Sequence, residues 1–568
     1  MLLLRQCLLN TYLVRLRVIA RFWQVDLTAR KQRELALKLA EAMANPETLT
    51  RAYQALTEQQ RQALRALLAS DGQMPQRVYA REWGEIRMMG PGRMDREEPW
   101  EEPISPAEGL WYRGFLFRSF EQGPDGAYET VFVPPEIRAH LPTPDEKQAD
   151  IALEPAPAPA TVYPSADLLL DDACTLLSYV QKERPRLVSN HRWSERHRQR
   201  LLHRLRIQVP DRFAFLSHIA HSIGWLVENE TGRLRLQSEP VTAWLEATTF
   251  DQRHTMAETW REDATWNDLF HVSSLQPEDT GAWRNDPVLA RKAIFRHLKS
   301  CAPQTWYRLK DFASAVKHVD PDFQRPDGDY ETWYIRDAET GTYLSGFESW
   351  DAVEGRLIRH LITRPLSWLG IVDLGVDKSG KRPSAFRLTE DGAAFLDLAD
   401  PPAPAEPSAP HLCSGFQVCM PAARRYERFQ LARVADWVES GDRFTYRLTP
   451  DSLLRAQKQG ISVKRVLEFL DEVTDGPLPR SVETAITRWD SRGTEAWLER
   501  SILLRLSSEE LMSRAMSSRG VGPLIKERIS PTMALVSERN WSRVAAGLEE
   551  MGLLPQIIGL NGGENRQR

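Results

Sequence analysis

The chain has 568 residues, 42% hydrophobic and 27% charged, and its formal net charge at pH 7 is −4. This length predicts several domains, because single hydrophobic cores stop growing near about 250–300 residues. The small negative charge excludes a general attraction to nucleic acid or anionic lipid, so any such binding requires local basic patches.

Residues 1–50 are predicted to form an N-terminal helical segment, clearest in ELALKLAEAMA. The apolar start, MLLLRQCLLNTYLVRLRVIARFW, is broken by four arginines, is too short for a membrane span and lacks a small-residue cleavage site. We therefore expect a docking helix and no membrane partner. Scattered cysteines argue against a disulfide framework and favour a reducing cytoplasm; they are Cys7, Cys174, Cys301, Cys413 and Cys419.

Residues 51–142 are predicted to form a first winged-helix-like unit. Thr57 and Gln60 have the spacing of a capping box, and Ser105 with Glu108 provides a later helix start. Further on, FLFRSF and ETVFVP can pair across a turn-rich segment as a hairpin. Three helices followed by a hairpin, the wing, is the order of a winged helix.

A Pro/Ala-rich linker is expected over residues 143–165, because EPAPAPATVYP resists both helix and sheet. Residues 166–286 then contain a second winged-helix-like unit and a helical connector. In this unit helical segments are followed by WLVEN, a turn, and RLRLQ, which can pair as a second wing.

Residues 287–400 are predicted to form a third winged-helix-like unit, with an insertion at about 319–348. In its hairpin, Ile371–Leu374 and Ala385–Leu388 are strands around a polar turn. Thr389 then caps a helix whose first turn is acidic. Each unit has a glycine near the first strand of its hairpin; these are Gly114, Gly224 and Gly370.

The turn of the third hairpin has the spacing of a phosphate-binding loop in Gly375, Gly380 and Lys381. Arg382 occupies the position that requires Ser or Thr, and a strand follows where a helix N-terminus should face the anion. We therefore interpret the turn as a basic wing tip.

The most informative charge feature runs from Gln181 to Arg206, with nine Lys or Arg against two Glu. On a helix beginning at Ser194, three arginines would form one stripe suited to phosphate contacts. The candidate contacts of the second unit are Arg192, Trp193, Arg196, Arg200 and Arg204. Those of the third unit are Arg356, Arg359, Arg364, Lys378, Lys381 and Arg382. The alternative for any single arginine is a solvated helix face.

A short linker, residues 401–410, precedes a region of different character over 411–556 and a flexible tail over 557–568. In this region LTP-x-SL-x-RA, Gly460 and VLEFL before GPLP resemble the N-terminal domain of XPB-type helicases. Upstream, GEIRMMGPGRMDREEPW and SPAEGLWYRG resemble bacterial proteins that carry that domain without a motor. The family begins its first strand with Asn or Asp after Gln, whereas this chain has LCSGFQV. The resemblance implies a helicase-associated role.

Other candidate chemistries are less well supported. His191, His197 and His203 would point in three directions on a helix, and zinc needs convergent ligands. Cys413, Cys419 and His411 are interpreted as strand residues. The run VLEFLDE has helical spacing, unlike the strand of an ATPase acidic motif. An acidic stretch lacks the pattern of a calcium loop or metal nuclease and is interpreted as a solvated loop; it holds Asp320, Asp322, Asp327, Asp329 and Glu331.

These patterns predict a mainly α protein with short antiparallel β-hairpins, an α+β fold of tandem winged-helix units plus an XPB N-terminal-like domain. We expect no enzyme activity, no cofactor and no metal. The function favoured is binding of nucleic acid, DNA ahead of RNA, or assistance to a separate helicase, through backbone contacts. The alternative is a protein–protein interaction scaffold in a transcription, repair or defence complex.

Overall fold

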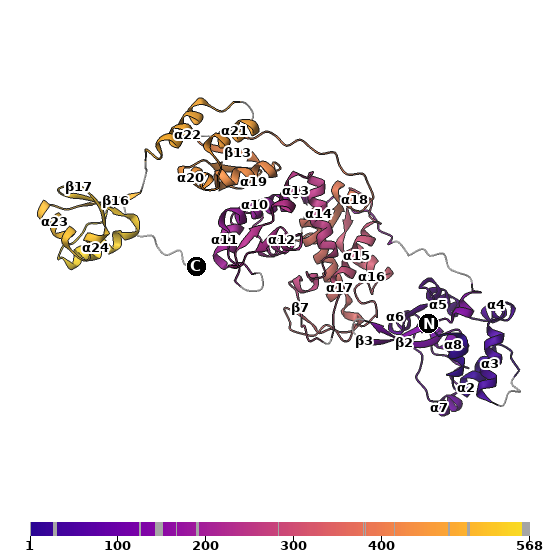
Figure 1. Ribbon diagram of the computed structural model, residues 1–568. Coiled ribbons are helices and arrows are strands. Elements are labelled where there is room, and N and C mark those ends of the chain that lie inside the picture. Colours follow the sequence, from indigo (N-terminus) through magenta and orange to yellow (C-terminus); the bar gives the residue numbers. More distant parts are fainter. Residues whose placement is uncertain are drawn as a thin grey trace. The chain divides into compact units, whose positions relative to one another are not determined.

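The computed structural model describes most of the chain: residues 2–26, 31–123, 126–141, 151–165, 167–188, 192–281, 283–378, 380, 382–413, 415–474, 477–496 and 500–558. It is an α+β protein with small antiparallel sheets, as predicted (Figure 1). The chain divides into two compact bodies: a large body of residues 1–460 and 469–477, and a small body of residues 461–468 and 478–568. No helix in the described ranges is long and apolar enough to cross a membrane.

The N-terminal part of the large body has its own hydrophobic core, built around residues such as Leu16, Leu64 and Phe115. Its helices before the first unit are α1 (Leu4–Leu9), α2 (Leu13–Phe22), α3 (Gln32–Met43) and α4 (Pro46–Gln54). The unit itself comprises α5 (Glu58–Ala69), β1 (Gln73–Pro75), α6 (Gln76–Trp83), α7 (Pro91–Glu97), α8 (Pro106–Tyr112), β2 (Phe117–Gly123), β3 (Gly126–Phe132) and α9 (Pro135–Arg138). Both predicted helix starts are present, since Thr57 caps α5 and Ser105 caps α8.

The second unit begins a larger core that continues into the third. Its elements are α10 (Leu168–Glu183), α11 (Glu195–Leu202), α12 (Pro210–Ser222), β5 (Leu226–Glu228), β6 (Leu234–Leu236), α13 (Ser238–Glu246) and α14 (Thr249–Glu262). The predicted hairpin is present as β5 paired with β6. A connector with η1 (Asp268–His271) and β7 (Leu275–Pro277) follows, and β7 pairs with β9 (Ile335–Asp337).

The third unit contains the hairpin predicted around residue 380. Its elements are α15 (Pro287–Leu298), β8 (Tyr307–Arg308), α16 (Leu309–Val319), η2 (Phe347–Ser349), α17 (Trp350–Leu361), the π-helical turn η3 (Ile362–Leu366), β10 (Val372–Val376), β11 (Ala385–Leu388) and α18 (Glu390–Phe395). Thr389 caps α18 as predicted. The linker prediction was wrong at one point, because β4 (Thr161–Tyr163) pairs with β10 and extends the sheet in the order β4-β10-β11-β8.

The three units share one connectivity. In each, an extended segment after the first helix pairs with the last strand of the hairpin: β1 with β3, Arg186 with Arg233, and β8 with β11. Gly114, Gly224 and Gly370 precede the three hairpins, and each has a positive φ, which favours glycine. The shared glycine therefore marks the same backbone turn in all three units.

Two helical glycines of the third unit give opposite expectations for the same substitution. A Cβ at Gly392 in α18 would overlap the carbonyl oxygen of Ile371, so Gly392→Ala should destabilise by about 1–3 kcal/mol. A Cβ at Gly355 in α17 would lie 3.7 Å from the Trp350 ring, an ordinary contact. Gly355→Ala should therefore stabilise by about 0.5–1 kcal/mol, because alanine favours helix. Urea unfolding of both variants measures these changes in the free energy of unfolding. Changes of the same sign in the two variants would contradict the prediction.

The C-terminal region begins in the large body with β12 (His411–Leu412), β13 (Gln417–Pro421), α19 (Arg425–Val434), β14 (Asp436–Glu439), β15 (Arg443–Arg447) and α20 (Pro450–Lys458). The strands form a sheet in the order β12-β13-β15-β14. Helix α21 (Val463–Val473) contains VLEFLDE, so the helical interpretation of that run is confirmed. Beyond it lie α22 (Arg480–Arg492), β16 (Ser501–Arg505), α23 (Glu509–Ser517), η4 (Gly522–Leu524), β17 (Ile525–Ser530), β18 (Met533–Ser537), η5 (Glu538–Asn540) and α24 (Trp541–Glu550).

Candidate nucleic-acid interface

A buried ion-pair network joins the second unit to the C-terminal region. The Asp171 carboxylate, on α10, lies 3.0 Å from both Arg425 of α19 and Arg206. Arg428, also on α19, donates to the Thr175 hydroxyl at 2.9 Å and to the carbonyl of Asp171. These contacts hold α19 against α10, although the two helices are about 250 residues apart in the chain.

This packing covers part of the predicted basic stretch. Lys182 pairs with Asp436 at 2.7 Å. Helix α11 ends at Leu202, so Arg204 lies beyond it and does not continue the predicted stripe. The Arg204 guanidinium instead lies 5.0 Å from the ring centre of Tyr179 and 5.3 Å from that of Trp437. The Lys182 and Arg204 side chains therefore serve the contact with β14.

Other arginines of the second unit remain exposed and close together. Arg196 and Arg200, on α11, are exposed, as is Arg233 on the segment leading into β6. Burial lowers the pKa of His197, and these three guanidinium groups lower it further against the opposing effect of Glu183. We define the arginine patch as Arg186, Arg196, Arg200, Arg233 and Arg235, all of which are exposed.

Three members of the arginine patch were missed from the sequence. Arg186 pairs through its backbone with Arg233, and Arg235 lies two residues further on. Arg186 was counted in the basic stretch but not named as a contact, whereas for Arg233 and Arg235 the available signal was the alternation R-L-R-L, in which Leu234 is buried and its neighbours face outward. The alternation identifies the exposed face of the strand, but it does not show that this face lies close to α11.

The remaining candidates of the second unit are placed differently from one another. Arg192 is exposed. Trp193 is partly buried, donates through Nε1 to the Ser217 hydroxyl at 2.8 Å, and packs edge-on against Phe213. Stacking of Trp193 on a base stays a prediction, because its ring is engaged by the core in this conformation.

The third-unit candidates fall into two groups. Arg356 pairs with Asp337 at 2.7 Å, and Arg364 pairs with Asp211 at 3.3 Å. Arg359 donates to the carbonyl of Pro383, and burial together with Arg382 lowers the pKa of Arg359. Lys378 and Arg382 are exposed at the hairpin turn, whereas Lys381 lies outside the described residues. The structure thus brings Arg359 and Arg382 together and ties Arg356 and Arg364 to carboxylates.

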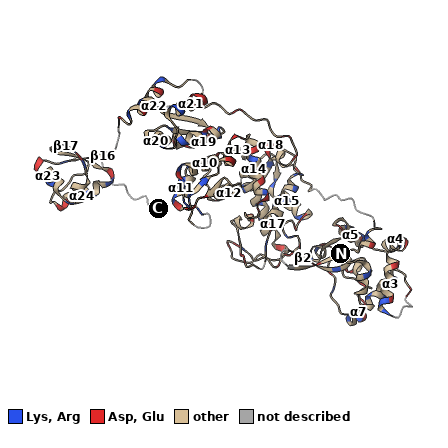
Figure 2. Ribbon diagram, in the orientation of Figure 1, with Lys and Arg blue, Asp and Glu red and all other residues tan. Residues whose placement is uncertain are grey.

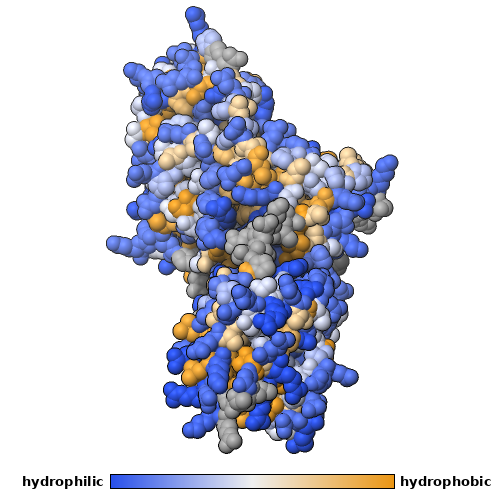
Figure 3. Space-filling view, turned by 90° about the vertical axis from the view of Figure 1, so that its right-hand side faces the viewer, coloured by the Kyte–Doolittle hydropathy of each residue, from blue (hydrophilic) through white to orange (hydrophobic). Residues whose placement is uncertain are grey.

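Charge and hydrophobicity are otherwise dispersed. Figure 2 shows acidic and basic residues interspersed along the elements. On the face presented in Figure 3, hydrophobic residues form small groups among hydrophilic ones. The views in Figures 2 and 3 thus agree with the expectation, from the net charge, that nucleic-acid binding requires local basic patches.

The interpretation of the acidic stretch as a solvated loop was wrong. Asp322 accepts hydrogen bonds from Arg81 and from the Tyr330 hydroxyl, each at 2.9 Å. Asp329 is buried and pairs with Arg77 at 2.6 Å. Both arginines lie on α6 of the first unit, so these carboxylates are structural contacts within the large body.

One group in the described residues has ligand atoms close enough for a metal ion: His411, Cys413 and Cys419, within 4.8 Å of one another. Cys413 and Cys419 are joined as a disulfide, which the cysteine pattern did not predict. In this oxidised form the two sulfurs offer no thiolate ligands. Of the three histidines considered earlier, His197 bonds the Tyr179 hydroxyl at 2.7 Å, and His191 lies outside the described residues.

His360, on α17, provides a pH test of the third unit. Burial lowers its pKa to about 3, with Arg364 and His271 adding to the shift. In the unfolded chain the His360 imidazole has a pKa of about 6.5. As pH falls, His360 is therefore protonated in the unfolded state before it is protonated in the folded state. Stability should therefore drop below pH 6.5, by about 2 kcal/mol at pH 5 from this group.

The measurement is urea unfolding at pH 7.5 and pH 5 for the wild type and His360→Gln. The variant should show a smaller acid-induced loss than the wild type, by about 2 kcal/mol, whatever its stability at pH 7.5. Equal losses in both proteins would rule out His360 as the titrating group.

Comparison with known proteins gives one family match. Residues 414–530 match the family described as "Helicase conserved C-terminal domain". The match runs from β13 to the end of β17 and covers about a fifth of the chain. No curated protein matches the chain. The C-terminal region is therefore helicase-related, whereas its resemblance to the XPB N-terminal domain stays a prediction.

Proposed function

We propose that this protein binds DNA or RNA without catalysis of its own and assists a separate helicase. The observation that carries the proposal is the arginine patch, five exposed arginines on α11, on the hairpin beside it and on the extended segment that pairs with that hairpin. The patch belongs to the unit that packs against α19, inside the helicase-related match. Clustered, exposed arginines suit the phosphates of a nucleic-acid backbone.

We infer that the three units are winged helices, on the basis of their shared connectivity. In that fold the third helix commonly enters the major groove. The corresponding helix of the second unit, α12, exposes Asp211, Ala214 and Ser222, none of which is basic. The proposal is therefore backbone binding through α11 and the wing, with little reading of base sequence.

The absence of catalysis is part of the proposal. Ser222, His218 and Asp263 lie together, as in a hydrolase triad, but Nε2 of His218 faces both Asp263 at 2.5 Å and Ser222 at 3.3 Å. A relay needs one imidazole nitrogen for each partner. We expect no esterase activity and no ATP hydrolysis from purified protein, and activity that survives further purification would contradict this.

The direct test is fluorescence anisotropy with a 30-base-pair duplex, a 30-nucleotide single strand and RNA of the same sequence. For about two to five phosphate contacts, affinity should fall about 10- to 500-fold between 50 and 200 mM salt. A scrambled duplex should bind equally well. Affinity that does not fall with salt would contradict phosphate contacts.

The second candidate function is a protein-interaction scaffold. It is favoured by the net charge of −4 and by the absence of basic residues among the exposed positions of α12. A pull-down from nuclease-treated lysate separates the two. Partners that persist without nucleic acid favour the scaffold, and partners that disappear favour the primary proposal.

A further inference from the structure

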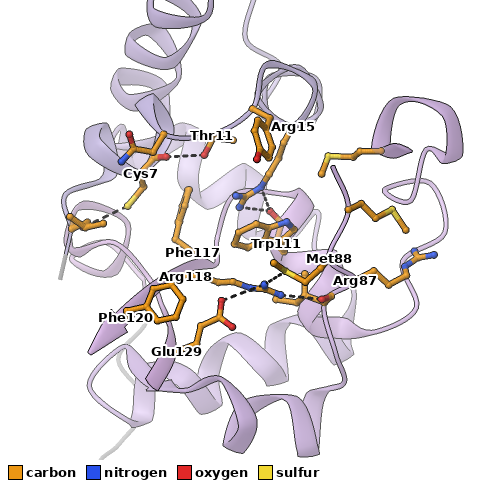
Figure 4. A pocket seen from close by; sticks show the side chains of 16 residues that line it. Cys7, Thr11, Arg15, Arg87, Met88, Trp111, Phe117, Arg118, Phe120 and Glu129 are labelled. Carbon is orange, nitrogen blue, oxygen red and sulfur yellow. Dashed lines mark hydrogen bonds and ion pairs between the residues drawn. The ribbon is translucent and has the colours of Figure 1, made fainter. Parts of the chain in front are cut away.

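The N-terminal part of the large body contains a pocket of about 410 Å³ that the proposed function does not use. It is lined by side chains from α1, α2 and the residues next to them, from α7 and the segment before it, and from α8, β2 and β3 (Figure 4). A volume of this size is sufficient for a few large side chains.

Exposed hydrophobic side chains gather around this pocket. Among the described residues of 2–141, six large hydrophobic side chains are exposed: Leu2, Leu3, Tyr12, Met88, Ile104 and Phe120. Four of them, Leu2, Tyr12, Met88 and Phe120, line the pocket. Met88 is 79% exposed and Phe120 is 73% exposed. Single exposed hydrophobic residues are ordinary, but a cluster around a cavity is typical of an interaction site.

The pocket wall carries two cations around one indole ring. Arg15 is only 4% exposed, and its guanidinium carbon lies 3.4 Å from the ring centre of Trp111. The guanidinium carbon of Arg118 lies 5.1 Å from the same ring centre, and Figure 4 shows Trp111 between the two arginines. The wall is therefore both aromatic and positively charged.

The positive charge of the wall is incompletely neutralised. Arg15 donates to the carbonyls of Trp111, at 2.8 Å, and Leu116, at 2.9 Å, and no carboxylate in the described residues pairs with it. Arg118 pairs with Glu129 at 3.4 Å, but its buried Nε has no hydrogen-bond partner. A buried and a partly buried guanidinium group thus lie near one carboxylate, which pairs with Arg118 only, and a second anion would be stabilised there.

We propose that this pocket docks a segment of a partner protein that carries a large apolar side chain beside a carboxylate. The apolar side chain would pack among Met88, Phe120 and Tyr12, and the carboxylate would approach Arg118. Methionine side chains adapt to irregular partners, which suits such a site. A nucleic-acid backbone is a poorer occupant, because the rim of the pocket is apolar.

The test is selection of displayed random 12-residue peptides on the full-length protein. Selected peptides should combine Leu, Phe or Trp with Asp or Glu. A synthetic selected peptide should bind the double variant Met88→Ser/Phe120→Ser at least 10-fold more weakly than the wild type. Replacing the acidic residue of the peptide with its amide should also weaken binding, and added salt should reduce the difference between the two peptides.

Ile104→Ser is the matched control, since Ile104 is 60% exposed in the same part of the large body but does not line the pocket. It should leave peptide binding unchanged. Far-UV circular dichroism confirms that each variant is folded. No enrichment, selection of apolar or basic peptides alone, or equal binding to the double variant would overturn the proposal. So would self-association of the wild type that the double variant abolishes, because the occupant would then be a second copy.

Discussion

Replacing Asp171 with alanine is expected to lower the free energy of unfolding of the large body by about 3–5 kcal/mol. The Asp171 side chain is 2% exposed and lies 3.0 Å from both Arg425 and Arg206. Arg428, which is fully buried, also faces this carboxylate. Removing the carboxylate takes a counter-ion from the buried Arg425 and Arg428, although Arg425 still pairs with Asp167, and a buried charge that loses a partner is strongly unfavourable.

Asp442→Ala is the matched control for this experiment. Asp442 pairs with the same residue, Arg206, but its side chain is 99% exposed. Its removal should change stability by no more than about 1 kcal/mol. Urea unfolding followed by tryptophan fluorescence measures both variants. If Asp171→Ala and Asp442→Ala lower the free energy of unfolding by the same amount, burial does not explain the effect of removing Asp171.

Reversing three charges of the arginine patch is expected to lower nucleic-acid affinity by about 100-fold or more at 100 mM salt. The variant is Arg196→Glu/Arg200→Glu/Arg233→Glu, and all three side chains are exposed, so folding should be retained. Each lost phosphate contact should also reduce the slope of log K against log salt by about 1. Anisotropy titrations at several salt concentrations measure both quantities.

The control has the same change in net charge at another place. Lys31, Arg33 and Lys38 are exposed at and within α3, and their reversal to glutamate should leave affinity nearly unchanged. If both triple variants lose affinity equally, the effect comes from net charge rather than from the arginine patch. If neither loses affinity, the second unit does not contact the nucleic acid.

The sequence by itself determined the local structure of this protein. At the helix starts, the hydroxyls of Thr57, Ser105 and Thr389 each accept a hydrogen bond from the backbone N–H three residues later, so these signals survive without tertiary information. The same is true of the hairpin of β10 and β11, whose apolar strands and polar turn are adjacent in the chain. The α+β class followed from these local patterns.

The tertiary structure alone decided which charges are available for binding. Lys182 and Arg206 lie in the most basic stretch of the chain, yet carboxylates more than 200 residues away pair with them. Arg233, which no helical pattern singled out, is brought beside α11 by its pairing with residue 186. A periodic pattern identifies a face of an element, but only the packing of distant segments determines whether another segment covers that face.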